Sequence, residues 1–202
     1  LSQVVSAIST GRHWVVLADL AQERSAAQDT PRLNALLDRA EGQGLLRLMQ
    51  SNSYAGKTIL SGGTIWNTTV AIRHPHSLGT AAQGTEVGEG ARLRLELPHG
   101  AVVQNESLLY AYNGYTDNTN NWLIMAGAVS NTWSAPVTFD IPVKVDVLDA
   151  DGVFALNAGI GGSGALEKRG PGTLLLGGTD PNTYPGDTLA ADGTLWLSKP
   201  DG

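Results

Sequence analysis

The chain contains no cysteine, so neither disulfide bonds nor thiolate metal ligands can hold its fold. Only 6% of its 202 residues are aromatic and 16% are charged, and no apolar run reaches the roughly 18 residues that a membrane-spanning helix needs. The net charge of -6 comes from residues 51–202, which carry 8 basic and 14 acidic side chains. We therefore expect no basic face for nucleic acid. The lack of a long apolar run also predicts no membrane-spanning helix in this segment.

Glycine, by contrast, is abundant, and it marks the boundaries of many short runs. The 25 glycines, together with Asn and Asp, separate short apolar or threonine-rich segments, while a hydrophobic content of 42% is sufficient for a substantial core. Residues 92–97 and 143–147 alternate between polar and apolar side chains, which is typical of strands buried on one face. The sequence predicts an all-β protein built from short strands and tight turns.

One pattern of residues occurs twice. The motif at 52–58 (NSYAGKT) returns at 182–188 (NTYPGDT), and the motif at 63–66 (GTIW) returns at 193–196 (GTLW), both at an offset of 130 residues. Short turn signals that arise by chance would not stay in phase over this distance. The repetition predicts an elongated solenoid made of stacked units.

The amino-terminal part reads differently, and two interpretations stay open for it. Residues 19–24 and 31–49 contain charges and leucine spacings compatible with helices. Residues 46–48 (LRL) can instead be aligned with 174–176 (LLL) as a degenerate strand repeat, which we favour. We therefore divide the chain into an atypical segment, 1–43, that is a degenerate repeat or a helical or irregular cap, and a repeat region, 44–202.

The second copy of the pattern resembles a known family. The run at 162–176 (GSGALEKRGPGTLLL), followed by 182–188 and 193–197, is similar to the autotransporter-associated β-strand repeat (passenger-associated repeat) proteins. This resemblance implies a right-handed, single-stranded parallel β-helix, or β-solenoid, within a large bacterial surface or secreted protein. Stacked rungs would place inward apolar side chains in one column.

The alternation within each motif assigns side chains to the two faces of the expected rungs. The predicted inward positions are Leu174, Leu176, Leu195, Leu197, Ile59 and Ile65, and the predicted outward positions are Thr173, Leu175, Thr194 and Trp196.

No group of residues has the spacing of a catalytic, cofactor or metal site. Asp140, Lys144, Asp146, Lys168 and Arg169 supply the residue types of a sugar-acting enzyme without convergent spacing. The acidic residues at 146, 149 and 151 lack a full calcium ligand set, and the histidines at 74 and 76 lack a third ligand. We expect no catalytic residues, no cofactor and no bound metal.

Aromatic residues mark the candidate surface for a ligand or partner. Tyr110, Tyr112 and Trp122 flank a polar run at 113–121 that itself contains Tyr115, and aromatic faces beside amides could bind sugar rings there. Trp66 and Trp196 occupy equivalent outward positions of the two motifs and predict a patch for self-association or for another partner.

The function expected from these features is structural. The chain would be a non-enzymatic, extracellular or cell-surface module, such as a stalk, adhesin or filament subunit. It would stack through open strand edges, end to end with itself or with further repeats of the same chain. The last residues, 197–202, follow a strand signal directly, so we expect a segment of a longer chain. The alternatives are a carbohydrate-binding or polysaccharide-cleaving β-helix, with glycans as partners, and an autotransporter passenger segment.

Overall fold

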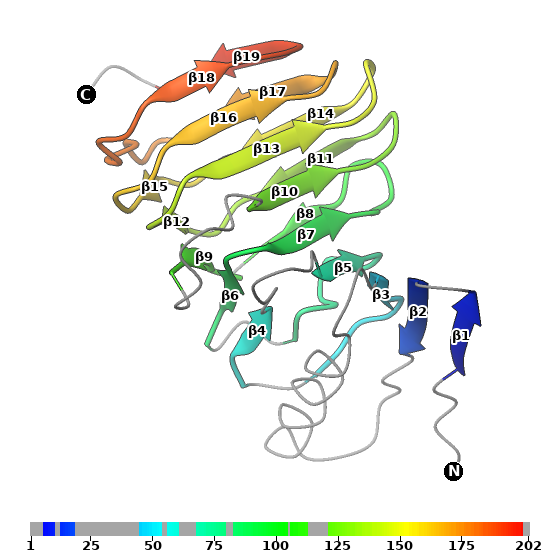
Figure 1. Ribbon diagram of the computed structural model, residues 1–202. Helices are drawn as coiled ribbons and strands as arrows, with labels where there is room; N and C mark the ends of the chain where they lie inside the picture. Colours follow the sequence, from blue (N-terminus) through cyan, green and yellow to red (C-terminus); the bar gives the residue numbers. More distant parts are fainter. Residues whose placement is uncertain are drawn as a thin grey trace.

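The computed structural model describes residues 6–10, 13–18, 45–53, 56–60, 68–79, 83–104, 106–112 and 121–199. Its strands form three sheets, which we name A, B and C (Figure 1).

Sheet A has nine strands, in the order β1 (Ser6–Thr10), β2 (His13–Ala18), β3 (Leu45–Leu48), β5 (Thr68–Ile72), β7 (Ala91–Leu95), β10 (Trp122–Met125), β13 (Val143–Val147), β16 (Leu166–Arg169) and β18 (Thr188–Ala190). Sheet B has five, in the order β4 (Thr58–Leu60), β6 (Thr85–Gly88), β9 (Leu108–Ala111), β12 (Val137–Phe139) and β15 (Ile160–Gly161). Sheet C also has five, in the order β8 (Val102–Val103), β11 (Ser130–Trp133), β14 (Val153–Leu156), β17 (Thr173–Leu176) and β19 (Thr194–Leu197).

The chain visits the sheets in turn and then begins the next rung, as Figure 1 shows for the stack from β7 to β19. One full rung runs through β10, β11 and β12, and the next through β13, β14 and β15. The pairs between these rungs are parallel. This is the predicted all-β parallel β-solenoid, with about six turns.

Inward side chains of the three sheets fill one continuous core. In β13 the valines are buried while Lys144 and Asp146 face outward, as the alternation predicted. Four of the assigned positions in β17 are confirmed, since Leu174 and Leu176 are buried and their neighbours Thr173 and Leu175 are not. Burial of this kind contributes about 25 cal/mol per Å² of apolar surface, so the column of stacked apolar side chains is the main source of stability.

The last rung follows the same register with less cover. β19 pairs with β17 so that Leu195 lies on Leu174 and Leu197 on Leu176, which places both on the inward face as predicted. Leu195 is partly buried, whereas Leu197 is 67% exposed. Trp196 faces outward and is 61% exposed.

The inward assignment of Ile59 was wrong. In β4 the side chains of Thr58 and Leu60 are buried, and Ile59 is 40% exposed. The Thr58 hydroxyl reaches the core because it donates a hydrogen bond to the carbonyl of Leu78 (3.3 Å), which satisfies its polar atom. Ile65 lies outside the described residues.

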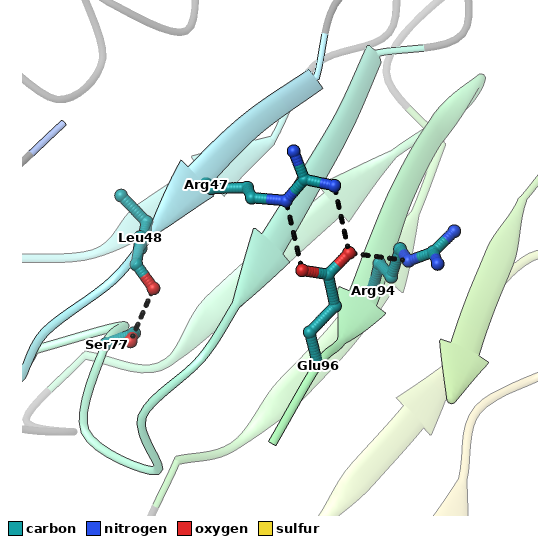
Figure 2. A network of polar contacts seen from close by, with 5 residues as sticks. All are labelled: Arg47, Leu48, Ser77, Arg94 and Glu96. Carbon is teal, nitrogen blue, oxygen red and sulfur yellow. Dashed lines mark hydrogen bonds and ion pairs between the residues drawn. The ribbon is translucent and has the colours of Figure 1, made fainter. Parts of the chain in front are cut away.

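Two loops close the corner of the first turns, where the described residues contain no sheet C strand. The buried Ser77 donates a hydrogen bond to Leu48 O (3.1 Å; Figure 2), and its hydroxyl oxygen also lies 3.0 Å from Gln50 O. Asn52 donates through Nδ2 to Ser77 O (2.6 Å). These bonds link loop 49–53 to loop 73–79 and satisfy polar groups that strand pairing satisfies elsewhere.

At the amino-terminal end, β1 and β2 pair antiparallel, and β2 continues sheet A by pairing parallel with β3. Residues 45–48 are therefore a strand, which contradicts the helical interpretation at this point and agrees with the degenerate repeat. Residues 19–24 and 31–44 lie outside the described part, so the boundary at residue 43 stays a prediction. The described residues include no helix long and apolar enough to cross a membrane.

Candidate functional surface

The outer face of sheet A carries ordered rows of charged side chains, because every second residue of its described central strands points away from the core. In parallel, in-register rungs, outward residues form rows along the solenoid, about 4.8 Å apart. One row contains Arg92, Trp122, Lys144, Glu167 and Leu189 in successive rungs. We call it the Trp122 row.

A second row is built around an ion-pair network. Arg47 lies opposite Ala71, which lies opposite Arg94. Figure 2 shows the Arg47 guanidinium extending toward Glu96, with Nε 3.0 Å from Oε2, while Arg94 Nε lies 3.0 Å from Oε1. Arg47 thus reaches over the intervening strand β5, whose Ala71 is fully buried.

The electrostatic balance at Glu96 favours the carboxylate. Burial alone would raise the pKa of Glu96, but the hydrogen bond from Arg47 and the charges of Arg47, Arg94 and Arg73 outweigh it and hold the pKa below its ordinary value. Arg47 and Arg94 thus share one carboxylate as their ion-pair partner, so the cluster keeps a net positive charge.

The Trp122 row differs, because its cations pack against an aromatic ring. Arg92 Cζ lies 5.9 Å from the centre of the Trp122 ring, and Lys144 Nζ lies 5.2 Å from it. Both distances are within the range of cation–π attraction. Within the described part of the chain, no carboxylate lies at ion-pair distance from Arg92 or Lys144.

The structure brings some of the sugar-enzyme residue types together and separates others. Lys144, Asp146 and Arg169 share the outer face of sheet A, with Asp146 directly opposite Arg169. Burial raises the pKa of Asp146, and the positive charges of Lys168, Arg169 and Arg94 oppose that rise. Asp140 is exposed and lies beyond the end of β12 in sheet B.

Lys168 points into the solenoid, in line with the buried Val145. Its side chain is fully buried, and its ammonium donates to the carbonyls of Arg169 (2.6 Å), Gly170 (2.7 Å) and Asp192 (3.1 Å). Three acceptors use all three donors of the ammonium. Lys168 is therefore a link between two rungs, a role that the sequence interpretation missed although its spacing of two from the buried Leu166 indicated an inward position.

Among the aromatic candidates, Tyr110 does not lie on a surface. It is fully buried, packs edge-on against Phe139 with ring centres 5.7 Å apart, and donates a hydrogen bond to Trp122 O (3.0 Å). Tyr112 is 56% exposed, and Trp122 is partly buried in the row described above. Tyr115 and Trp66 lie outside the described residues.

A shallow groove of about 480 Å³ adjoins this face, at the starts of β13, β16 and β18. Lys144 and Leu166 contribute to its lining, and so do the acidic residues Glu167 and Asp187. Glu167 forms an ion pair with Arg169 (2.6 Å). The groove is therefore a region of mixed charge, in contrast to the cationic end of the Trp122 row.

The described residues include no group of three or more His, Asp or Glu side chains that could hold a metal ion. The rings of His74 and His76 lie 5.6 Å apart, and His74 Nδ1 accepts the backbone N–H of His76 (3.1 Å), so this nitrogen is used within the loop. Asp149 Oδ1 likewise accepts the backbone N–H of Asp151 (3.2 Å), which ties down a turn.

Comparison with known proteins identifies the repeated segments. Residues 40–66 and 166–197 match the Passenger-associated-transport-repeat family, and these two stretches contain the two copies of the motif. The chain is also 27% identical over 145 residues to the adhesin BmaC autotransporter of Brucella suis biovar 1 (strain 1330). That match covers 72% of this chain but only 3% of the relative. No solved structure matches the chain.

Proposed function

Since the chain carries passenger-associated transport repeats on a single parallel β-solenoid, we infer that it is a structural segment of a bacterial autotransporter adhesin-like surface protein. Its function is to form a stiff stalk or spacer that presents other parts of the protein away from the cell, outside the cell or on its surface. It does so without catalysis and without a cofactor.

The uninterrupted ladder of sheet A carries this proposal. From β2 to β18 each strand pairs parallel with the next, so that backbone hydrogen bonds run along the solenoid axis. A rod of this kind resists bending because each rung is fixed by its neighbours in three sheets. About six rungs at about 4.8 Å each give a stack roughly 30 Å long.

The positions and hydrogen bonds of the candidate acid–base groups support the proposal that the module is not catalytic. Lys168 is occupied with three carbonyls inside the solenoid, and Asp140 belongs to another face than Lys144 and Asp146. A glycoside-hydrolysing site of the most common kind needs two carboxylates on either side of the scissile bond.

The rung formed by β18 and β19 supports stacking as the way in which the module extends. Leu189 is 55% exposed and Leu197 is 67% exposed, although Leu197 has the register of a core residue. The next rung can come from further repeats of the same chain or from a second copy. Either occupant would bury Leu197 and pair the free backbone groups of β19.

Surface display tests the proposed function. The chain is fused upstream of a laboratory autotransporter translocator, and exposure of an amino-terminal epitope is measured on intact cells by antibody and by added protease. We expect a displayed, protease-resistant rod. Val145→Asp, which puts a charge into the core, should give a protease-sensitive passenger, whereas Lys144→Asp on the outer face should not. Equal protease sensitivity of the native chain and Val145→Asp would refute the proposal.

Self-association is tested separately by electron microscopy and light scattering over a range of concentrations. If a second copy provides the next rung, the chain should form rods longer than one stack. Leu197→Asp should shorten them, and the neighbouring exposed Ser198→Asp should leave them unchanged. Single short rods at every concentration would exclude stacking between copies and leave further repeats of the same chain as the occupant.

A further inference from the structure

The Trp122 row contains two cations, Arg92 and Lys144, that form no ion pair with any carboxylate in the described part of the chain. Three other basic side chains of sheet A, Arg47, Arg94 and Arg169, each have an acidic partner. Arg47 and Arg94 share Glu96 (Figure 2), and Arg169 pairs with Glu167. Arg92 and Lys144 have an aromatic neighbour where the others have a carboxylate.

This arrangement keeps the charge of both cations available. A cation–π contact orients a cation without cancelling its charge, unlike an ion pair. Trp122 lies between the two, one rung from each, so that Arg92 and Lys144 are held about 10 Å apart along the solenoid axis. Trp122 is thus a positioning residue for two outward cations.

The surrounding chain makes this pair conspicuous. The protein has a net charge of -6, so two neighbouring cations without an acidic partner among the described residues contrast with the overall charge balance. Within the described residues, the acids closest in the row lie beyond Lys144, where Glu167 and Asp187 line the groove. The cationic site therefore extends from Lys144 toward Arg92, away from the groove.

We propose that Arg92, Trp122 and Lys144 form a binding strip for an anionic polysaccharide, whose chain lies along the solenoid axis across two rungs. The spacing of the two cations is comparable to the length of a disaccharide, so that acidic groups on alternate sugars would meet Arg92 and Lys144. The outer edge of the Trp122 ring offers an apolar contact for the C–H surface of the sugar between them. This interaction is additional to the structural role proposed above.

A polysaccharide fits better than other polyanions. Duplex nucleic acid requires a broad basic face, whereas this strip has two free cations and is bounded by acids at one end. A folded acidic protein would need a larger complementary patch than a single row provides. An acidic peptide remains a competing ligand, and the experiment distinguishes it.

The test is a set of binding titrations of the full chain with heparin, with polygalacturonate, with uncharged dextran and with poly-glutamate, at low and at physiological salt. We expect binding to one or both anionic polysaccharides that weakens with salt, and weaker binding to dextran and poly-glutamate. Arg92→Gln and Lys144→Gln should each reduce affinity by about tenfold. Trp122→Leu should reduce it by a smaller factor, because the cations remain but are no longer held.

Arg47→Gln is the matched control, since it removes an equal charge from the same sheet at a site already paired with Glu96. Its affinity should equal that of the native chain, and thermal melting should show that all variants are folded. An equal loss of affinity in Arg47→Gln would mean that only the net charge of the chain matters, and it would overturn the proposal. So would equal affinity for poly-glutamate, or no binding to either polysaccharide at low salt.

Discussion

Replacement of Lys168 by methionine tests the inner link between rungs. Methionine has nearly the same length as the lysine side chain and fits the same space, but it cannot donate. The carbonyls of Arg169, Gly170 and Asp192 would each lose a hydrogen bond from a buried ammonium. An unsatisfied buried acceptor costs about 1–3 kcal/mol, and part of this is recovered where the corner admits water.

We therefore expect Lys168→Met to lower the free energy of unfolding by about 3 kcal/mol, which for a chain of this size corresponds to a fall in Tm of roughly 6–12 °C. Urea titration followed by far-ultraviolet circular dichroism measures the first quantity, and a thermal scan measures the second. The loss should be accompanied by faster amide exchange in β18 and β19, because the link joins β16 to Asp192 in the turn between these two strands.

The control is Lys144→Met, the same substitution on the outer face of the preceding rung. It removes only the contact with Trp122, so we expect a loss of about 0.5–1 kcal/mol. If the two variants lose the same stability, then the three carbonyls are satisfied equally well without Lys168, and the assigned role is wrong.

Three further predictions concern strain and pH. Gly162 has φ +98° and an added Cβ would overlap the backbone of Phe139, whereas Gly100 has φ +77° and open space around it. In urea titrations, Gly162→Ala should therefore lower the free energy of unfolding by about 3 kcal/mol and Gly100→Ala by about 1 kcal/mol. Similar losses for the two variants would refute the close approach of Gly162 to Phe139. Burial raises the pKa of Glu106 above its ordinary 4.5, so the fold favours the protonated side chain and its stabilising contribution is lost as pH rises. Glu106→Gln should therefore raise the urea midpoint at neutral pH but not near pH 4. Glu96 has the opposite sign, because its lowered pKa gives stability that is lost as pH falls; Glu96→Gln should cost about 1 kcal/mol at neutral pH, with the difference vanishing in acid. A pH-independent effect of either substitution would contradict the assigned charge environment.

The fold could be predicted from the sequence because both patterns follow from backbone geometry. Stacked rungs produce the repeat, and the period of two in a strand produces the alternation. In β13 and β17 strands of four or five residues have enough alternation to fix which face is buried. β4 has three residues, and a buried threonine at one end reversed the predicted phase. A period of two cannot be determined reliably from so short a run.

The constant offset between the two motifs did not predict which sheet each strand joins. Residues 46–48 align with 174–176, yet β3 lies in sheet A and β17 lies in sheet C. The same motif can serve different faces because the rungs vary in length, from 22 residues between Trp122 and Lys144 to 30 between Arg92 and Trp122. A local pattern specifies a strand and a turn, while the length of the preceding loops decides which sheet receives it.

The candidate surface was predicted only in part. Tyr110 was assigned to a ligand surface from its polar neighbours, but those neighbours say nothing about which side of the strand it occupies. Trp122 was identified by its aromatic character, whereas its partners Arg92 and Lys144 are separated from it by a full rung and become neighbours only through strand register. Contacts between rungs can therefore be predicted only after the length of each rung is known.

The Arg47–Glu96 ion pair has a consequence for how the solenoid unfolds. A stack in which each unit touches only the next can lose its terminal unit without disturbing the rest. Here the small side chain of Ala71 lets β3 interact with β7 across the strand between them. Loss of β3 therefore weakens two rungs at once, and the amino-terminal turns should come apart as a block, with a sharper transition than nearest-neighbour contacts alone would produce.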